Sequence, residues 1–191
     1  MFNLPSLFLR ILGYDIDECR ILSIKALISC FHSRSHISIG NKSHIGRRVD
    51  LRIGPGSQLV IGKNCKIDDD VRLIIVNNSK LTVADNVKIG KGSILNCGDT
   101  CSIGDSTLIS GYCYIQCSSH GLASDTNIRA QSHVHSPIII GRDCLVGAFC
   151  FISPGSILGD GSVCGAHSFV KGTVEPYTIN SGIPAQFMRS R

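Results

Sequence analysis

Apolar residues recur at every sixth position along much of this chain. The spacing is clearest between residues 140 and 171, where a small residue usually follows each apolar one; the apolar positions are Ile140, Val146, Ile152, Leu158, Cys164 and Val170. Neither the period of a helix nor that of a strand sustains this spacing. A fixed six-residue repeat is typical of a parallel β-helix, in which three hexapeptides close one triangular coil. The small residue then stands where the chain must bend.

The same spacing continues toward the N-terminus and marks four more coils. Their apolar positions are Ile39, Ile45, Leu51, Ile61, Ile67, Leu73, Val83, Ile89, Leu95, Ile103, Ile109 and Ile115. The first members stand at 39, 61, 83 and 103, so coils of 18 residues carry insertions of four, four and two residues at one corner. A sandwich of short strands would need alternation and hairpin turns that the sequence lacks. The pattern predicts an all-β chain with a parallel β-helix over residues 37–175.

Residues 1–36 do not follow the six-residue spacing. Apolar residues lie at helical spacing on either side of Gly13, and Asp15 or Asp17 is a candidate N-cap for the second of two short helices. The expectation is a helical cap over the open edge of the first coil, because an exposed β edge invites aggregation. The alternative is weak contact with a membrane surface through Phe2, Leu4, Phe8 and Leu9. Charged residues interrupt the segment too often for it to span a bilayer.

The repeat fails between residues 118 and 137. This stretch reads SSHGLASDTNIRAQSHVHSP and holds three of the seven histidines, His120, His133 and His135. A polar loop ejected from a regular solenoid is a common place for function. Two further coils follow, and Pro176 then ends the repeat; the tail, residues 176–191, turns at positions 182–184 and carries Arg189 and Arg191.

Composition narrows the class of protein. A chain of 191 residues fits one domain with a sizeable core. Charged residues make up 17% and aromatic residues 6%, which suits a thin prism filled with aliphatic side chains. The net charge of +5 comes without a dense basic cluster or interleaved aromatic residues, so nucleic-acid binding is not expected. A mild positive balance fits an anionic cofactor.

Ten cysteines suggest disulfides or a metal, but the repeat offers a simpler interpretation. Five of them lie two residues before a repeat position, where other coils have Ser or Thr; they are Cys65, Cys101, Cys113, Cys144 and Cys150. That position needs a small side chain, and reduced Cys behaves as one. No secretory signal is present, so a reducing cytoplasm is expected. Cys97 and Cys101 are four apart, as are Cys113 and Cys117, but no CxxC pair exists, and no metal is expected.

The chain resembles the hexapeptide-repeat acyltransferases of the left-handed β-helix fold. The branch it resembles contains the maltose and galactoside O-acetyltransferases and the capsule or O-antigen sugar O-acetyltransferases. Three stretches carry the resemblance: residues 103–120, which lead from IGD to QCSSH, residues 137–170, and residues 181–185, SGIPA. The resemblance implies a left-handed β-helix, acetyl-CoA as co-substrate, no metal, and a homotrimer whose active sites lie between subunits. It also implies a sugar or glycan acceptor.

The resemblance places the catalytic histidine at His120. An acceptor hydroxyl is almost fully protonated at neutral pH, so its attack on a thioester needs a general base, and histidine suits this task. Asn96 stands where the sugar-acetylating relatives have an acceptor-binding Asn, and its amide can both donate to and accept from a hydroxyl. His133 and His135 could bind acceptor or a neighbouring subunit, but an ordinary surface role is the simpler expectation.

The resemblance also implies a cofactor groove along the last coils. A backbone N–H near Ala148 would stabilise the oxyanion, and main-chain groups beside Ala148 and Ala166 would hold the pantetheine arm. Lys171 and Arg189 match positions near the coenzyme A phosphates. The chain departs from the family at two places, since Leu145 stands where Trp is frequent and His167 replaces a Gly.

Three other functions remain open from the sequence. Within the same class, the acceptor could be the amino group of a sugar nucleotide. A zinc hydratase similar to the γ-class carbonic anhydrases would need three convergent histidines, for which only His120, His133 and His135 are candidates. A structural solenoid without catalysis would leave His120 without a role.

Overall fold

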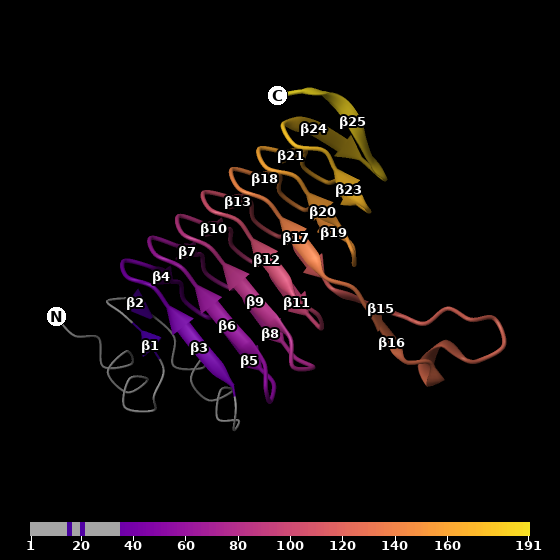
Figure 1. Ribbon diagram of the computed structural model, residues 1–191, viewed down its shortest axis with the longest axis horizontal. Helices are drawn as coiled ribbons and strands as arrows, with labels where there is room; N and C mark the ends of the chain where they lie inside the picture. The colour runs from indigo at the N-terminus through magenta and orange to yellow at the C-terminus, as the bar shows by residue number, and fades with distance from the viewer. Residues whose placement is uncertain (1–14, 17–19, 22–34) are drawn as a thin grey trace.

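The computed structural model describes residues 15–16, 20–21 and 35–191. Parallel strands stack into three sheets that form the faces of a triangular prism, with the chain advancing one coil at a time from the N-terminal end (Figure 1). The first sheet contains β1 (Asp15–Ile16), β3 (His36–Ile39), β6 (Gln58–Ile61), β9 (Lys80–Val83), β12 (Cys101–Ile103), β17 (Ile138–Ile140), β20 (Ile157–Leu158) and β23 (Thr173–Val174).

The other two faces are built in the same way. The second sheet contains β2 (Arg20–Ile21), β4 (His44–Ile45), β7 (Lys66–Ile67), β10 (Lys88–Ile89), β13 (Leu108–Ile109), β18 (Leu145–Val146), β21 (Val163–Cys164), β24 (Thr178–Gly182) and β25 (Ala185–Ser190). The third contains β5 (Asp50–Ile53), β8 (Arg72–Ile75), β11 (Ile94–Cys97), β14 (Tyr114–Gln116), β19 (Phe151–Ile152) and β22 (Phe169–Val170). The predicted parallel β-helix is therefore confirmed.

The six-residue repeat forms the interior of the prism. All eighteen predicted positions are buried, and none is more than 4% exposed. Register holds them in columns, as Ile39 pairs with Ile61, Ile61 with Val83, and Val83 with Ile103. Each coil therefore buries its apolar side chains against those of its neighbours, as expected of a solenoid.

The predicted insertions lie at the corner between the third and first sheets, but they lengthen the strands on both sides of it. Strands β5 and β6 each have four residues, whereas β19 and β20 of the later coils have two. Each lengthened strand buries one extra side chain; in this coil these are Ile53 and Leu59. The first coils are therefore wider at this corner than the last ones.

The described residues before position 35 differ from the predicted helical cap. Residues 15–16 form β1 and pair in parallel with β3, while residues 20–21 form β2 and pair with β4. Their backbone thus takes the hydrogen-bonding edge that a helix would have left open. The rest of the predicted cap, including Phe2, Leu4, Phe8 and Leu9, lies outside the described residues. No helix in the described part of the chain is long and apolar enough to cross a membrane.

The C-terminal tail continues the prism. Strand β24 pairs in parallel with β21, and β25 then folds back antiparallel on β24. The tail therefore forms a hairpin over the edge of the second sheet.

A turn of 3-10 helix, η1 (Ile128–Ala130), lies in the ejected loop.

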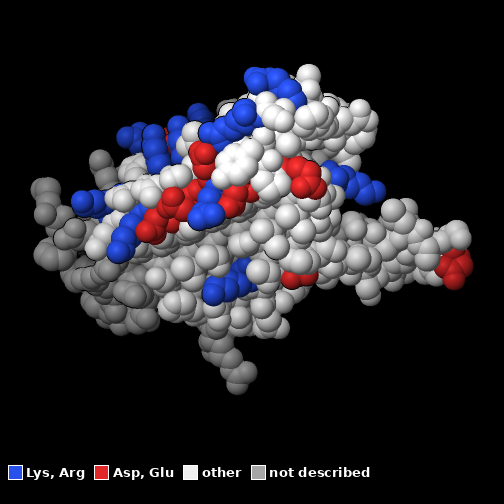
Figure 2. Space-filling model, turned by 45° about the horizontal axis from the view of Figure 1, so that its top comes forward, with Lys and Arg blue, Asp and Glu red and all other residues white. Residues whose placement is uncertain are grey.

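Charged side chains lie on the outside and pair across coils. Asp160 accepts hydrogen bonds from the Arg142 backbone N–H (2.8 Å) and from its Nη2 (2.7 Å), and the Arg142 side-chain bond is the main reason that the pKa of Asp160 is lowered. The face in Figure 2 shows acidic side chains interleaved with Lys and Arg, without a large patch of one sign.

Candidate active site

The ejected loop leaves the prism at the corner between the third and first sheets. Its two ends form an antiparallel pair, β15 (Ser118–His120) and β16 (His133–His135), which projects away from the stack (Figure 1). The Ser136 N–H donates to the Cys117 carbonyl oxygen (2.9 Å) and closes the root of the loop. Farther out, the Gln131 side-chain amide bonds the Ala123 backbone at both its N–H and its carbonyl (2.8 and 2.9 Å). The loop is thus held by its own hydrogen bonds, a role for Gln131 that the sequence pattern did not suggest.

His120 lies exposed on β15 near this root. Its ring packs on that of His133, with 4.2 Å between the ring centroids and 40° between the planes. The centroid of His135 lies 6.2 Å from that of His133. Among the described residues no side chain hydrogen-bonds the ring nitrogens of His120, so its imidazole is available to exchange a proton with a bound acceptor.

Asn96 lies on the outer face of the third sheet, one coil before the loop. It pairs in register with Gln116 of β14, and its carbonyl accepts from the Cys117 N–H (3.0 Å). The Gln116 amide in turn donates to the Ser118 carbonyl (2.7 Å). Asn96 and Gln116 therefore form an outward-facing column of amides directly beneath the loop root. The repeat pattern gave no reason to single out Gln116.

Ala148 and Ala166 are stacked on each other at a different corner, between the second and third sheets. The His167 N–H donates to the Ala148 carbonyl (2.9 Å), which links the two coils. In the first coil the matching N–H of Arg47 is bonded by the Asp69 carboxylate one coil later (2.7 Å). Ala166 has no such acceptor, and no described residue accepts from the Ala148 N–H. The amides of Asp69, Lys91 and Gly111, at the same corner in other coils, have no acceptor among the described residues either, so the donor is free wherever no acidic side chain stands one coil later.

The two candidate cations lie beyond these alanines. Lys171 is exposed just after β22, at the following corner, and Arg189 is exposed on β25. Arg189 donates to the neighbouring Ser190 carbonyl (3.3 Å), whereas Arg191 is tied to the Asp143 carboxylate (2.8 Å). Of the two C-terminal arginines, Arg189 is therefore the one without an acidic partner in the described part of the chain.

Comparisons with known proteins assign the family. No family model matches the chain. A crystal structure of a mutant of AntD, an N-acyltransferase from Bacillus cereus, superposes with a TM-score of 0.67 at 20% identity, over 100% of this chain and 90% of that one. A probable acetyltransferase of Mycobacterium tuberculosis is 31% identical over 82% of this chain, which spans 52% of that relative. The putative colanic acid biosynthesis acetyltransferase WcaF of Escherichia coli is 34% identical over 69% of both chains.

The chain belongs to the hexapeptide-repeat acyltransferases. The left-handed β-helix that the resemblance implied is therefore its fold. The chain spans about half the length of the mycobacterial relative.

A column of aromatic rings lies beside the two alanines. The rings of Tyr112 and Phe149 stack at 5.2 Å and 8°, and those of Phe149 and His167 at 4.9 Å and 9°. All three residues have φ near +60°, because each occupies the tight bend of its coil. His167, for which the resemblance led us to expect Gly, thus packs on a ring of the previous coil. Leu145, which stands where Trp is frequent, is 38% exposed.

Most of the cysteines behave as predicted. The thiols of Cys65, Cys113, Cys144 and Cys150 each donate to a carbonyl of the next coil, at 3.0 to 3.2 Å, as Ser43 does in its own coil. The eight described cysteines are all buried free thiols. Burial raises the pKa of Cys164 to about 12.

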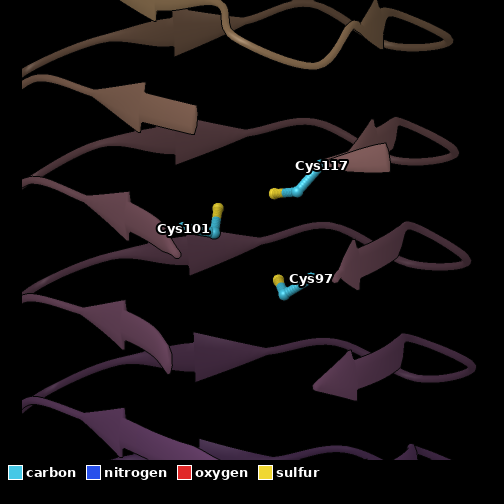
Figure 3. Close-up of side chains that lie close together, drawn as sticks. All are labelled: Cys97, Cys101 and Cys117. Atoms are coloured by element: carbon cyan, nitrogen blue, oxygen red, sulfur yellow. The ribbon is translucent and has the colours of Figure 1, made fainter. Parts of the chain in front are cut away.

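Cys101 is also a buried free thiol in its predicted column, which reaches Ser156 two coils later, but its immediate neighbours there are the aliphatic Leu81 and Ile138. Its sulfur meets those of Cys97 and Cys117, and the three Sγ atoms lie within 4.8 Å of one another (Figure 3). Hydrogen bonds from Cys101 and Cys97 lower the pKa of Cys117, and the contacts within the group and burial raise the pKa of the other two. The sequence shows only that Cys97 and Cys101 are four residues apart. It does not indicate the cluster, because the third member, Cys117, comes from the next coil.

Proposed function

We propose that this protein transfers an acetyl group from acetyl-CoA to a hydroxyl of a sugar or polysaccharide. Membership of the hexapeptide-repeat acyltransferases supports the transfer of an acyl group. The relative WcaF, named as a colanic acid biosynthesis acetyltransferase, supports a glycan acceptor. The structural observation that carries the proposal is the free Ala148 N–H at a corner kept open by Ala166.

His120 is the general base in this proposal. Its neutral imidazole accepts the acceptor's hydroxyl proton as the oxygen attacks the thioester carbonyl carbon. The tetrahedral intermediate then collapses, the C–S bond breaks, and the imidazolium returns the proton to the departing thiolate of coenzyme A. Asn96 binds the acceptor, since an amide can both donate to and accept from a sugar hydroxyl.

The Ala148 N–H stabilises the oxyanion that forms in this step. A fixed backbone donor is worth most where charge develops in the transition state. The pantetheine arm lies along Ala148 and Ala166, where small side chains allow close approach. Lys171 and Arg189 bind the phosphates as exposed cations near the end of the stack.

The site is shared between subunits of a homotrimer. His120 leaves the prism at the corner between the third and first sheets, whereas Ala148 and Ala166 lie at the corner between the second and third. One chain therefore presents the base and the thioester site at different corners. A neighbouring copy would bring its Ala148 corner to the projecting loop, so that His120 of one chain acts with Ala166 and Lys171 of the next.

The hydratase alternative finds little support in the arrangement of the histidines. His120, His133 and His135 share one exposed hairpin, and the group of three metal-ligand donors within reach of one another in the described part of the chain consists of cysteines. An amino-sugar nucleotide remains the alternative acceptor, and the experiment below separates it from a hydroxyl acceptor.

The test is release of coenzyme A thiol from acetyl-CoA in the presence of sugars, glycans and amino-sugar nucleotides. Release should require a hydroxyl acceptor and should fall by about a hundredfold or more in His120→Ala, the lower range for loss of a general base. His44→Ala, in the first coil, is the matched control and should keep the wild-type rate. Acceptor-dependent release that survives His120→Ala would remove His120 as the base. Release only with amino sugars would assign N-acetylation, and no release together with no thermal shift by coenzyme A would refute the proposal.

A further inference from the structure

The Cys97, Cys101 and Cys117 cluster lies inside the prism, in the two extra columns of the widened corner. One column continues Ile53 and Ile75 into Cys97, and Cys117 follows in the next coil. The other column holds Leu59, Leu81, Cys101 and Ile138. Aliphatic side chains fill these columns below the cluster, so cysteine enters them only where the three sulfurs meet.

The chain is also shorter at this corner. Leu81 lies six residues after Ile75, whereas Cys101 lies four residues after Cys97, so the turn is tightened by two residues. The tighter turn brings the two sulfurs together from β11 and β12, and Cys117 adds a third from the end of β14 (Figure 3). The coil whose turn is two residues shorter is therefore also the coil in which cysteines replace the aliphatic side chains of these two columns.

We propose that Cys97, Cys101 and Cys117 form a buried three-thiolate site for a soft d10 metal ion, Cu(I) or Zn(II). Sulfurs bound to one ion at about 2.3 Å stand roughly 4 Å apart. The three Sγ atoms lie within 4.8 Å of one another, close to that spacing. Thiolates select these soft ions over hard ones such as Mg²⁺ and Ca²⁺.

The number of donors favours Cu(I). Structural zinc in proteins is almost always four-coordinate, so Zn(II) would need a fourth ligand beside these three. All three cysteines are fully buried, and their columns bring aliphatic side chains from the neighbouring coils. Each thiol gives up its proton as its metal–sulfur bond forms, so binding strengthens as pH rises. No change in the oxidation state of sulfur is involved.

The site lies directly under the root of the ejected loop. Cys117 is the residue before β15, and its carbonyl accepts the Ser136 N–H that closes the loop (2.9 Å). Above the short turn, His135 packs so closely that a Cβ at Gly98 would lie 2.8 Å from its Nδ1. A bound ion would therefore tie Cys117, at the start of the hairpin that carries His120, to β11 and β12 of the preceding coil, and would act as a structural brace away from the chemistry.

The experiment titrates fully reduced, anaerobic protein with Cu(I) and separately with Zn(II), each against a chromogenic chelator. Cys19→Ala and Cys30→Ala in the background remove the cysteines outside the described residues. We expect one ion per chain and a raised thermal midpoint, with affinity falling at least tenfold in Cys101→Ala and in Cys117→Ala. Cys113→Ser is the matched control and should bind as the parent does, because Ser fills that position in other coils.

X-ray absorption at the metal edge of the parent protein gives a result that does not depend on the variants folding. Three sulfur neighbours alone would assign the site to Cu(I), and three sulfurs with one lighter donor to Zn(II). Nitrogen and oxygen neighbours without sulfur would place the ion elsewhere, for example on the loop histidines, and would overturn the proposal. Absence of stoichiometric binding of either ion would overturn it as well.

Discussion

A single side chain decides whether a backbone donor is free at the corner between the second and third sheets. Where Asp69 follows Arg47 in the next coil, its carboxylate bonds the amide at 2.7 Å. Where Ala166 follows Ala148, that amide stays free among the described residues. The same bend can therefore serve stability in one coil and chemistry in another, and the residue one coil later selects between the two.

We expect Ala166→Asn to inactivate the protein without unfolding it. The Asn side-chain oxygen would take the place that Asp69 has beside Arg47, and would occupy the Ala148 N–H. Loss of one oxyanion donor lowers kcat by about a hundredfold to a thousandfold. The measurement is kcat at saturating acetyl-CoA, so that weaker cofactor binding is not mistaken for slower chemistry. Ala166→Gly leaves the amide free and should retain kcat; equal rates for the two variants would contradict the oxyanion role.

Neighbouring coils approach so closely that backbone meets backbone. At Gly147, an added Cβ would lie 2.5 Å from the Ala166 nitrogen and 2.8 Å from the Gly165 carbonyl carbon. Neither atom belongs to a flexible side chain, so the coils themselves would have to move. The small residue after each inward apolar residue is therefore required by the coil-to-coil distance as well as by the bend.

Gly147→Ala should destabilise the last coils. Forcing atoms into a packed site costs about 1–3 kcal/mol, and here the strain lies on the backbone. The measurement is the free energy of unfolding from urea titration. Gly54→Ala is the control, because its Cβ would come no closer than 3.4 Å to Val76 and its φ is not in the left-handed region. Similar stability of the two variants would show that the coils have room to adjust.

At the scale of the whole molecule, the projecting hairpin is exposed and partly apolar. Leu122 is 77% exposed, Ile128 56% and Val134 55%. Exposed apolar side chains grouped on one element are typical of a surface that another protein covers. A second copy of the chain fits this role, since the base and the thioester site lie at different corners of one prism.

Co-expression of two inactive variants tests the shared site. Mixed trimers of His120→Ala and Ala166→Asn should regain about a third of wild-type activity, since every mixed trimer has intact His120 and intact Ala166 together at one of its three sites, and the unsorted random population should regain about a quarter. Each variant alone should stay inactive. Differential tags would isolate the mixed assemblies for the rate measurement. No recovery in assemblies shown to be mixed would place both residues of a site in one chain.

Much of the fold follows from the sequence because each coil repeats one physical requirement. Residues such as Ile67 and Ile115 must point into the prism, and their six-residue spacing alone locates them. The cysteine cluster could not be found in this way, because Cys97, Cys101 and Cys117 meet only after two coils are in register and one turn has been shortened. The edge pairing of residues 15–16 and 20–21 has no periodic signal either, because two-residue strands are too short to show one.

The candidate site was less predictable from the sequence than the fold was. The ejected loop stood out because it interrupts a regular pattern, and the family resemblance then singled out His120 among its three histidines. Gln116 and Gln131 did not, since the bonds they make depend on the path of the loop. The free amide of Ala148 is a property of two coils together, and only the contrast between Ala166 and Asp69 makes it visible.

No insertion interrupts the coils between residues 140 and 171, so positions in successive coils at the end of the prism are separated by a regular distance. Ala148, Ala166 and the C-terminal hairpin follow one another at a constant rise, which for paired strands is about 4.8 Å. In the proposed function, the count of coils above Ala148 sets the distance from the thioester carbon to the cations that hold the phosphates. Duplicating one coil would move those cations about 4.8 Å farther from the thioester carbon. The number of coils at the end of the solenoid would thus select acyl carriers of one length.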